Sequence, residues 1–207
     1  LTTAILIFVP AIFFFVCDFG QVSIGKRTLL SLFQSVTTRT AGFNTADLSS
    51  MTEVGQAIMI LLMLMGGSPS STAGGMKTTT VAVLLLNAFA TFRSREDAGA
   101  FGRRFDSQVI KNAATIAMLY FVLFFFGGIT ISVYEGLSLQ LCLYEAASAV
   151  GTVGLTLGIT PGLHILSRLI LIVLMYLGRV GGLTLIYAVV SRRNTNAKMP
   201  LEKITVG

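Results

Sequence analysis

The chain is organised as long apolar segments separated by short polar ones. Apolar residues dominate residues 1–16, 54–65, 109–133 and 163–190. A helix needs about 20 apolar residues to cross a hydrocarbon core of about 30 Å, and these segments meet or approach that length. A helix also satisfies its backbone hydrogen bonds internally, as lipid requires. The pattern therefore predicts an all-α integral membrane protein.

Two further segments, residues 28–38 and 138–149, are too short to cross a membrane. We predict that each forms a half-helix that ends inside the membrane and leads into a glycine-containing loop. Irregular backbone at membrane depth is tolerated only where it is buried in protein or lines a watery cavity. The negative end of the first half-helix would also point to where a cation sits.

Residues 52–92 would form a helix about 60 Å long, twice the thickness of the hydrocarbon core. We therefore expect a break at residues 66–75, which contain four glycines, one proline and four hydroxyl residues. This segment is called the central loop below.

A repeat at a spacing of 112 residues relates these features. The shift places residues 40–43 (Thr-Ala-Gly-Phe, the first glycine loop) on residues 152–155 (Thr-Val-Gly-Leu, the second glycine loop). It also places residues 60–66 on residues 172–178. Internal repeats are typical of membrane transport folds. We expect two units, each built as membrane helix, pore loop and membrane helix.

The two units are expected at residues 1–92 and 109–190, with a linker at residues 93–108 and a tail at residues 191–207. Nine of the fifteen lysine and arginine residues lie in or beside the linker and tail. They are Arg93, Arg95, Arg103, Arg104, Lys111, Arg192, Arg193, Lys198 and Lys203. The positive-inside rule places the linker and tail in the cytoplasm.

The overall composition agrees with a membrane protein. Apolar residues make up 54% of the chain and charged residues 12%, and the mean hydropathy is +0.81. These values exclude a water-soluble globule. The net charge of +6 does not indicate nucleic-acid binding, because the basic residues gather where membrane topology explains them.

The glycine loops carry the candidate chemistry. Backbone carbonyls can replace the hydration shell of an alkali cation, and glycine allows the chain to turn them toward the ion. Thr152-Val153-Gly154 shares three residues with the potassium-channel filter motif. An alternative is that Gly42 and Gly154 are ordinary turn residues. The predicted filter residues are Thr40, Ala41, Gly42, Phe43, Thr152, Val153, Gly154 and Leu155, and the predicted potassium ligands are the carbonyls of Thr40, Ala41, Gly42, Thr152, Val153 and Gly154.

Four segments together resemble the Trk/Ktr/HKT superfamily of cation transporters, and within it the membrane subunits of bacterial Ktr potassium uptake systems. They are residues 37–45 (TTRTAGFNT), 66–78 (GGSPSSTAGGMKT), 148–155 (SAVGTVGL) and 178–182 (GRVGG). The resemblance implies a pseudo-tetrameric, potassium-channel-like pore built from four repeats. This chain resembles the third and fourth repeats, so it would be half of that pore and would lack the N-terminal half.

The resemblance also implies that the central loop obstructs the pore below the filter and that a basic residue of the last helix faces it. The implied gating residues are Gly66, Gly67, Ser68, Pro69, Ser70, Ser71, Thr72, Ala73, Gly74, Gly75, Lys77 and Arg179. An arginine at membrane depth normally faces a cavity or a partner. Two roles stay open for Arg179: an electrostatic barrier to potassium, or a structural partner of loop carbonyls or a carboxylate.

Three other charged residues are expected to have mainly structural roles. Lys77 is expected to anchor the central loop to helix carbonyls or lipid phosphates. Arg39 would repel cations if it pointed into a pore, so we expect it to face away and pair with a carboxylate. Glu145 is expected to brace either Arg39 or the second glycine loop from behind.

The function implied by the resemblance is sodium-stimulated potassium uptake across the bacterial cytoplasmic membrane. Potassium is the expected ion, with sodium as the alternative. The implied partners are membrane lipid, the missing N-terminal half, a second copy in a homodimer, and a cytosolic KtrA ring that alone binds nucleotide. A sodium-selective relative and a non-transporting scaffold are the alternative functions. An enzyme is not expected, because HExxH and Walker-type motifs are absent from the sequence.

Overall fold

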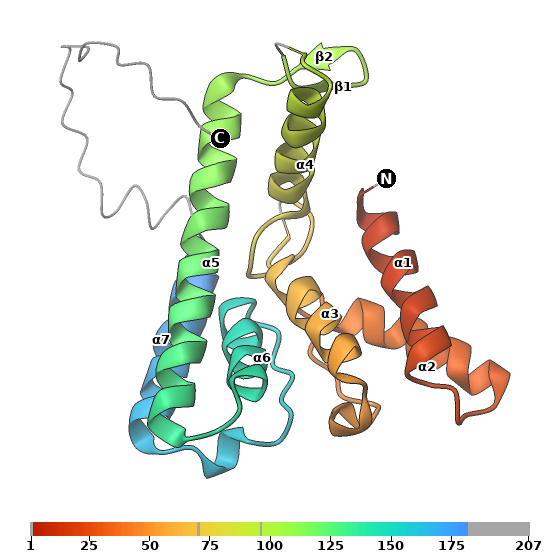
Figure 1. Cartoon of the computed structure of the whole chain (residues 1–207), viewed down its shortest axis with the longest axis vertical. Helices are drawn as coiled ribbons and strands as arrows, with labels where there is room; N and C mark the ends of the chain where they lie inside the picture. The colour runs from red at the N-terminus through yellow and green to blue at the C-terminus, as the bar shows by residue number, and fades with distance from the viewer. Residues whose placement is uncertain (1, 70, 96, 182–207) are drawn as a thin grey trace.

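A computed structural model describes residues 2–69, 71–95 and 97–181 (Figure 1). The helices are α1 (Thr2–Cys17), α2 (Ile24–Thr37), α3 (Glu53–Leu64), α4 (Thr78–Phe92), α5 (Ser107–Glu135), α6 (Leu139–Val150) and α7 (Ile165–Val180). Two short 3₁₀ turns, η1 (Leu48–Ser50) and η2 (Thr160–Gly162), precede α3 and α7. Strands β1 (Gly99–Ala100) and β2 (Arg103–Arg104) form an antiparallel hairpin.

Most helices lie where the sequence predicts them, and the long helix is broken between α3 and α4. The first half-helix, α2, begins four residues earlier than expected. The added turn is held against α1, because Arg27 donates to the carbonyl of Phe15 and its guanidinium lies 4.3 Å from the centre of that ring. The tail at residues 191–207 and the last part of the span expected at residues 163–190 lie outside the described residues.

The sequence repeat is matched by repeated local structure. A shift of 112 residues places η1 on η2, and it places the first residue of α3, Glu53, on the first residue of α7, Ile165. The half-helices pack similarly, since α2 contacts α1 and α6 contacts α5 (Figure 1). The central loop and α4 follow α3, and the residues that follow Gly181 in the second unit lie outside the described residues.

Within the described residues, α5 is the one helix that is both apolar and long enough to cross a membrane. Four further helices, α1, α3, α4 and α6, are apolar but only 10–17 residues long. Large apolar side chains such as Phe8, Phe126 and Tyr176 are exposed on α1, α5 and α7. Apolar surface of this extent requires cover by lipid or protein.

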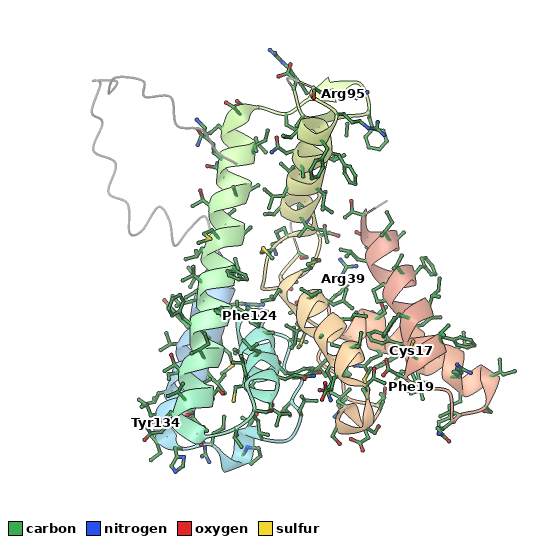
Figure 2. All side chains as sticks on the ribbon, viewed as in Figure 1. Cys17, Phe19, Arg39, Arg95, Phe124 and Tyr134 are labelled. Carbon is green, nitrogen blue, oxygen red and sulfur yellow. The ribbon has the colours of Figure 1, made fainter. Side chains whose placement is uncertain are left out.

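The buried core joins the two units around α3 and α6 (Figure 2). Met59, Met63, Tyr144 and Val150 are fully buried there. Two weak contacts to the Met59 sulfur on α3 cross this core. Gln34 Nε2 on α2 lies 3.4 Å from Met59 Sδ. Tyr144 Oη on α6 lies 3.8 Å from the same atom. Both half-helices therefore contact one thioether.

Candidate functional site

The two glycine loops meet at the ends of the half-helices. The first follows α2 and the second follows α6. The hydroxyl of Thr40 lies 3.4 Å from the carbonyl oxygen of Gly151, the residue before Thr152. Loops that are 112 residues apart in the sequence are therefore neighbours in space.

The loops share an uncommon backbone conformation at matched positions. Thr40 and Thr152 have φ of +66° and +50°, and Gly42 and Gly154 have φ of +74° and +93°. The left-handed region costs a residue with a side chain about 1–2 kcal/mol, so both threonines are strained. Such strain persists only where the surroundings hold it in place, and it clusters at functional sites. The glycines adopt the same region without this cost.

Gly42 lies directly against the second glycine loop. A Cβ atom at this position would overlap the carbonyl oxygen of Val153. Glycine is therefore required at residue 42 for two reasons: its backbone angle is left-handed, and the carbonyl oxygen of Val153 leaves no space for a side chain. At Gly154 a Cβ would meet open space, so the backbone angle alone favours glycine. The role of these carbonyls as potassium ligands stays a prediction.

Glu145 holds the segment that follows the second glycine loop. Its side chain lies on α6 and is 4% exposed. Its Oε1 accepts from the Thr156 hydroxyl (2.6 Å) and the Leu157 amide (3.1 Å), and its Oε2 accepts from the Thr160 hydroxyl (2.8 Å). Glu145 therefore braces the segment just after the second glycine loop, and no hydrogen bond joins it to Arg39 among the described residues.

The central loop is closed at its base by backbone hydrogen bonds. The amide of Met76 donates to Leu64 (3.0 Å) and the amide of Thr78 donates to Gly67 (3.2 Å). Lys77 then reaches over the loop, where Nζ donates to the carbonyls of Ser71 (3.0 Å) and Ala73 (2.6 Å). Lys77 thus anchors the loop through the loop's own carbonyls. Ser70, a predicted gating residue, lies outside the described residues.

Two arginines also contact the central loop. Arg179 on α7 donates to the carbonyl of Thr72. Arg39, labelled in Figure 2, donates from Nη2 to the carbonyl of Gly66 at 3.4 Å. The expectation that Arg39 pairs with a carboxylate is wrong for the described part of the chain. There the ion pair is Arg104–Asp97, and His164 contacts Glu135 at 2.8 Å. Arg39 lies just after α2, and its long side chain contacts the backbone carbonyl of Gly66 instead.

The central loop touches the second glycine loop. A Cβ at Gly74 would overlap the side chain of Thr152, whose hydroxyl is buried without a hydrogen-bond partner. A groove of about 570 Å³ borders Thr152, Gly154 and Arg179. A second cavity of about 310 Å³ lies between the loop, Lys77 and Arg179. The predicted filter and gating residues that the structure describes therefore lie in one continuous region.

Three residues of this region were missed by sequence reasoning. Thr156 and Thr160 form the clamp with Glu145, and their spacing of four residues in a loop rich in hydroxyl groups was the available signal. Met59 gave no such signal, because a methionine in an apolar helix is indistinguishable from ordinary core.

The sequence matches the model of the TrkH family, described as cation transport protein, over residues 1–197. It is 34% identical over 188 residues to the Ktr system potassium uptake protein B of Bacillus subtilis, a match that covers 91% of this chain and 42% of that protein. It is 35% identical over 217 residues to the potassium/sodium uptake protein NtpJ of Enterococcus hirae, covering 99% and 48%. The chain thus spans less than half the length of these relatives.

The fold is also similar to a solved structure. The crystal structure of the potassium transporter TrkH from Vibrio parahaemolyticus superimposes with a TM-score of 0.75 at 20% identity, covering 91% of this chain and 43% of that one. At this identity the likeness shows the fold, which is that of a helical membrane transporter. Together with the family match, it shows that the chain belongs to the TrkH family of cation transport proteins.

Proposed function

We propose that the chain supplies two membrane–pore loop–membrane units, half of a four-unit pore that takes up potassium across the cytoplasmic membrane. The units are residues 1–92 and 109–190, with the linker at residues 93–108 and the tail at residues 191–207 on the cytoplasmic side. The other half of the pore comes from a segment equivalent to the part of the relatives that this chain does not match.

The meeting of the two glycine loops carries this proposal. Matched left-handed positions at Thr40 and Thr152, and at Gly42 and Gly154, give both loops the same turn at the end of a half-helix. Such turns present backbone carbonyls in a repeated arrangement, which is how an alkali cation is selected. The half-helices also direct their negative ends toward the loops. Ordinary turn glycines would not need to coincide at a spacing of 112 residues.

The central loop is proposed as the obstruction below this filter. Its contact with Thr152 places it next to the second glycine loop, and three cationic side chains hold its carbonyls. Hydrogen bonds to charged donors are about twice as strong as those between neutral groups. Opening would require these contacts to be exchanged, so Arg179 serves first as a structural partner of the loop and adds positive charge beside the groove.

Further features of the proposal rest on the relatives. One relative is named as a component of a Ktr system. From the resemblance stated in the sequence analysis we further propose a homodimer on a cytosolic KtrA ring, with nucleotide bound by that ring alone. The name of NtpJ, a potassium/sodium uptake protein, supports sodium as a second transported ion. Stimulation by sodium is proposed from the family resemblance. A sodium-selective pore is therefore the second candidate function.

Rubidium uptake into vesicles tests the proposal. The complete four-unit transporter, carrying this chain as its second half, is reconstituted and compared with a Gly42→Ala variant in the same lipid. Uptake that potassium suppresses more strongly than sodium supports the potassium pore. Stronger suppression by sodium favours the second candidate. Absence of uptake in a well-folded preparation, or uptake unaffected by Gly42→Ala, contradicts the proposed filter.

A further inference from the structure

The linker contains a folded hairpin that the transport site does not use. Strands β1 and β2 pair Gly99 with Arg104 and Ala100 with Arg103. The hairpin packs on the end of α4, Ala98 is buried, and the amide of Phe105 donates to the carbonyl of Ala98 at 2.8 Å. It is therefore an ordered surface feature at the end of α4 and α5 (Figure 1).

The tip of the hairpin presents an aromatic side chain that touches little of its own chain. Phe101 is 94% exposed, and Phe92 at the end of α4 is 84% exposed. Phe101 and Gly102 both have positive φ, of +54° and +75°. Asparagine and glycine are the usual residues in such a two-residue turn, so a phenylalanine there is unfavourable both for the backbone and for its hydration. Contact outside the chain would explain this choice.

The length of α5 sets the height of the hairpin relative to a bilayer. Its 29 residues extend about 43 Å, which matches a bilayer of about 40–45 Å with both headgroup layers included. The hairpin joins α4 to the first residue of α5, Ser107, and so lies at the headgroup level. Aromatic rings are enriched at this level, where one part of the ring is in apolar surroundings and another is near water.

Residues 93–106 carry four arginines and three acidic residues, and the net charge of +1 favours an anionic surface. Within residues 93–95 and 97–106, one ion pair joins Arg104 to Asp97 at 3.6 Å, and both side chains are exposed. Arg93, Arg95 and Arg103 have no ionic partner in that part of the chain. Arg95 lies at the hairpin end of the molecule (Figure 2). Basic residues next to a membrane helix are attracted to anionic headgroups.

We propose that the β1–β2 hairpin binds the headgroup layer of anionic phospholipids, with Phe101 inserted at the boundary of the acyl chains and Arg103 on the phosphates. The inference needs only that α5 crosses a bilayer and that α4 ends beside the start of α5. It is independent of whether the chain conducts potassium.

The absence of tryptophan from the sequence provides a direct test. The 207-residue chain carrying Phe101→Trp is placed in vesicles of phosphatidylcholine with or without phosphatidylglycerol, together with phosphatidylcholine brominated at defined depths. Quenching should be strongest from bromine near the headgroup end of the acyl chain, and it should increase with phosphatidylglycerol. Phe92→Trp is the second reporter if Phe101→Trp lowers the helix content measured by circular dichroism.

Charge variants separate lipid binding from simple proximity. Adding Arg103→Gln should lower the equilibrium constant for headgroup contact about fivefold in anionic vesicles. Lys26→Gln, an exposed lysine at the start of α2, is the matched control and should leave it unchanged. Tryptophan emission typical of water, without quenching in any vesicle, overturns the proposal. An equal change in headgroup contact with Arg103→Gln and Lys26→Gln also overturns the proposal. Quenching that appears only after a cytosolic partner protein is added overturns it as well.

Discussion

The Cα of Gly42 faces the carbonyl oxygen of Val153, so that any side chain at residue 42 would overlap the backbone of the second glycine loop. This contact makes the two loops interdependent: the shape of one sets the position of a carbonyl in the other. Gly154, the matched residue, has open space where its side chain would be. The two glycines are therefore equivalent in backbone angle and different in surroundings, which leads to the first prediction.

Gly42→Ala should be more damaging than Gly154→Ala. Both substitutions place a side chain in the left-handed region at a cost of about 1–2 kcal/mol, and only Gly42→Ala adds overlap with Val153. We expect Gly154→Ala to give measurable rubidium uptake with a weaker preference for potassium over sodium, and Gly42→Ala to abolish uptake. Sodium competition and the melting temperature in detergent are the measurements. Equal effects of the two variants would show that the loops do not meet as described.

Glu145→Gln should loosen the segment after the second glycine loop. The carboxylate accepts three hydrogen bonds, whereas the amide nitrogen of glutamine accepts none. Hydrogen bonds to charged groups contribute about 1.5–3 kcal/mol each, so a lower melting temperature and a weaker ion preference are expected. Glu53→Gln, at an exposed position in the first turn of α3, is the control. A melting temperature equal to that of the control variant would exclude the clamp.

Arg179→Gln and Lys77→Gln should both raise the maximal uptake rate. The first removes one charged hydrogen bond to the central loop and the second removes two. The apparent affinity for potassium, set at the glycine loops, should change little. Together the variants separate two causes of obstruction. A cation beside the path acts mainly through its charge, and at about 4 Å it opposes a passing ion by about 4 kcal/mol at an effective dielectric of 20.

A rise with Arg179→Gln alone would therefore indicate electrostatic obstruction by Arg179. A rise with both would indicate obstruction by the loop that they hold. A fall in uptake and melting temperature with both variants would contradict the gating role, since the loop would then be needed only for folding.

Met59→Leu should destabilise the protein although it conserves side-chain volume. The change removes the sulfur that Gln34 and Tyr144 approach, leaving a buried amide without that acceptor at a cost of about 1–3 kcal/mol. Met63→Leu is the matched control, since Met63 is equally buried on the same helix and its sulfur accepts no hydrogen bond among the described residues. Differential scanning calorimetry of both variants gives their melting temperatures. Equal values would show that the contacts of Gln34 and Tyr144 with the Met59 sulfur do not stabilise the protein.

The helices and their breaks were predictable because each depends on local sequence. The break before α4 follows from residues 66–75, which hold four glycines and a proline, and the start of α7 follows from its repeat of α3. The early start of α2 was not predictable, because Arg27 stabilises that turn through Phe15 on another helix. The hairpin was missed for a different reason. Two-residue strands carry no periodicity, and Phe101 is an uncommon turn residue.

The site was only partly predictable. Both glycine loops and the central loop were identified from composition and spacing, and the structure brings them together. The partners were harder to predict: Arg39 was expected beside a carboxylate, yet it contacts Gly66, and Arg179 reaches Thr72 across 107 residues of sequence. Backbone carbonyls are present at every residue, so a sequence pattern cannot show which one a long cationic side chain will choose.

The hydrogen bond from Arg179 to Thr72 has a consequence for how such a duplicated chain can evolve. The shift of 112 residues places Arg179 on Gly67, so the residue that donates in one unit corresponds to the start of the acceptor loop in the other. A chain with two copies of the first unit would hold two loops and lack this arginine, and a chain with two copies of the second would hold two arginines and lack the loop. Gene conversion between the units would therefore remove the interaction in either direction, and selection for it would keep the two copies different.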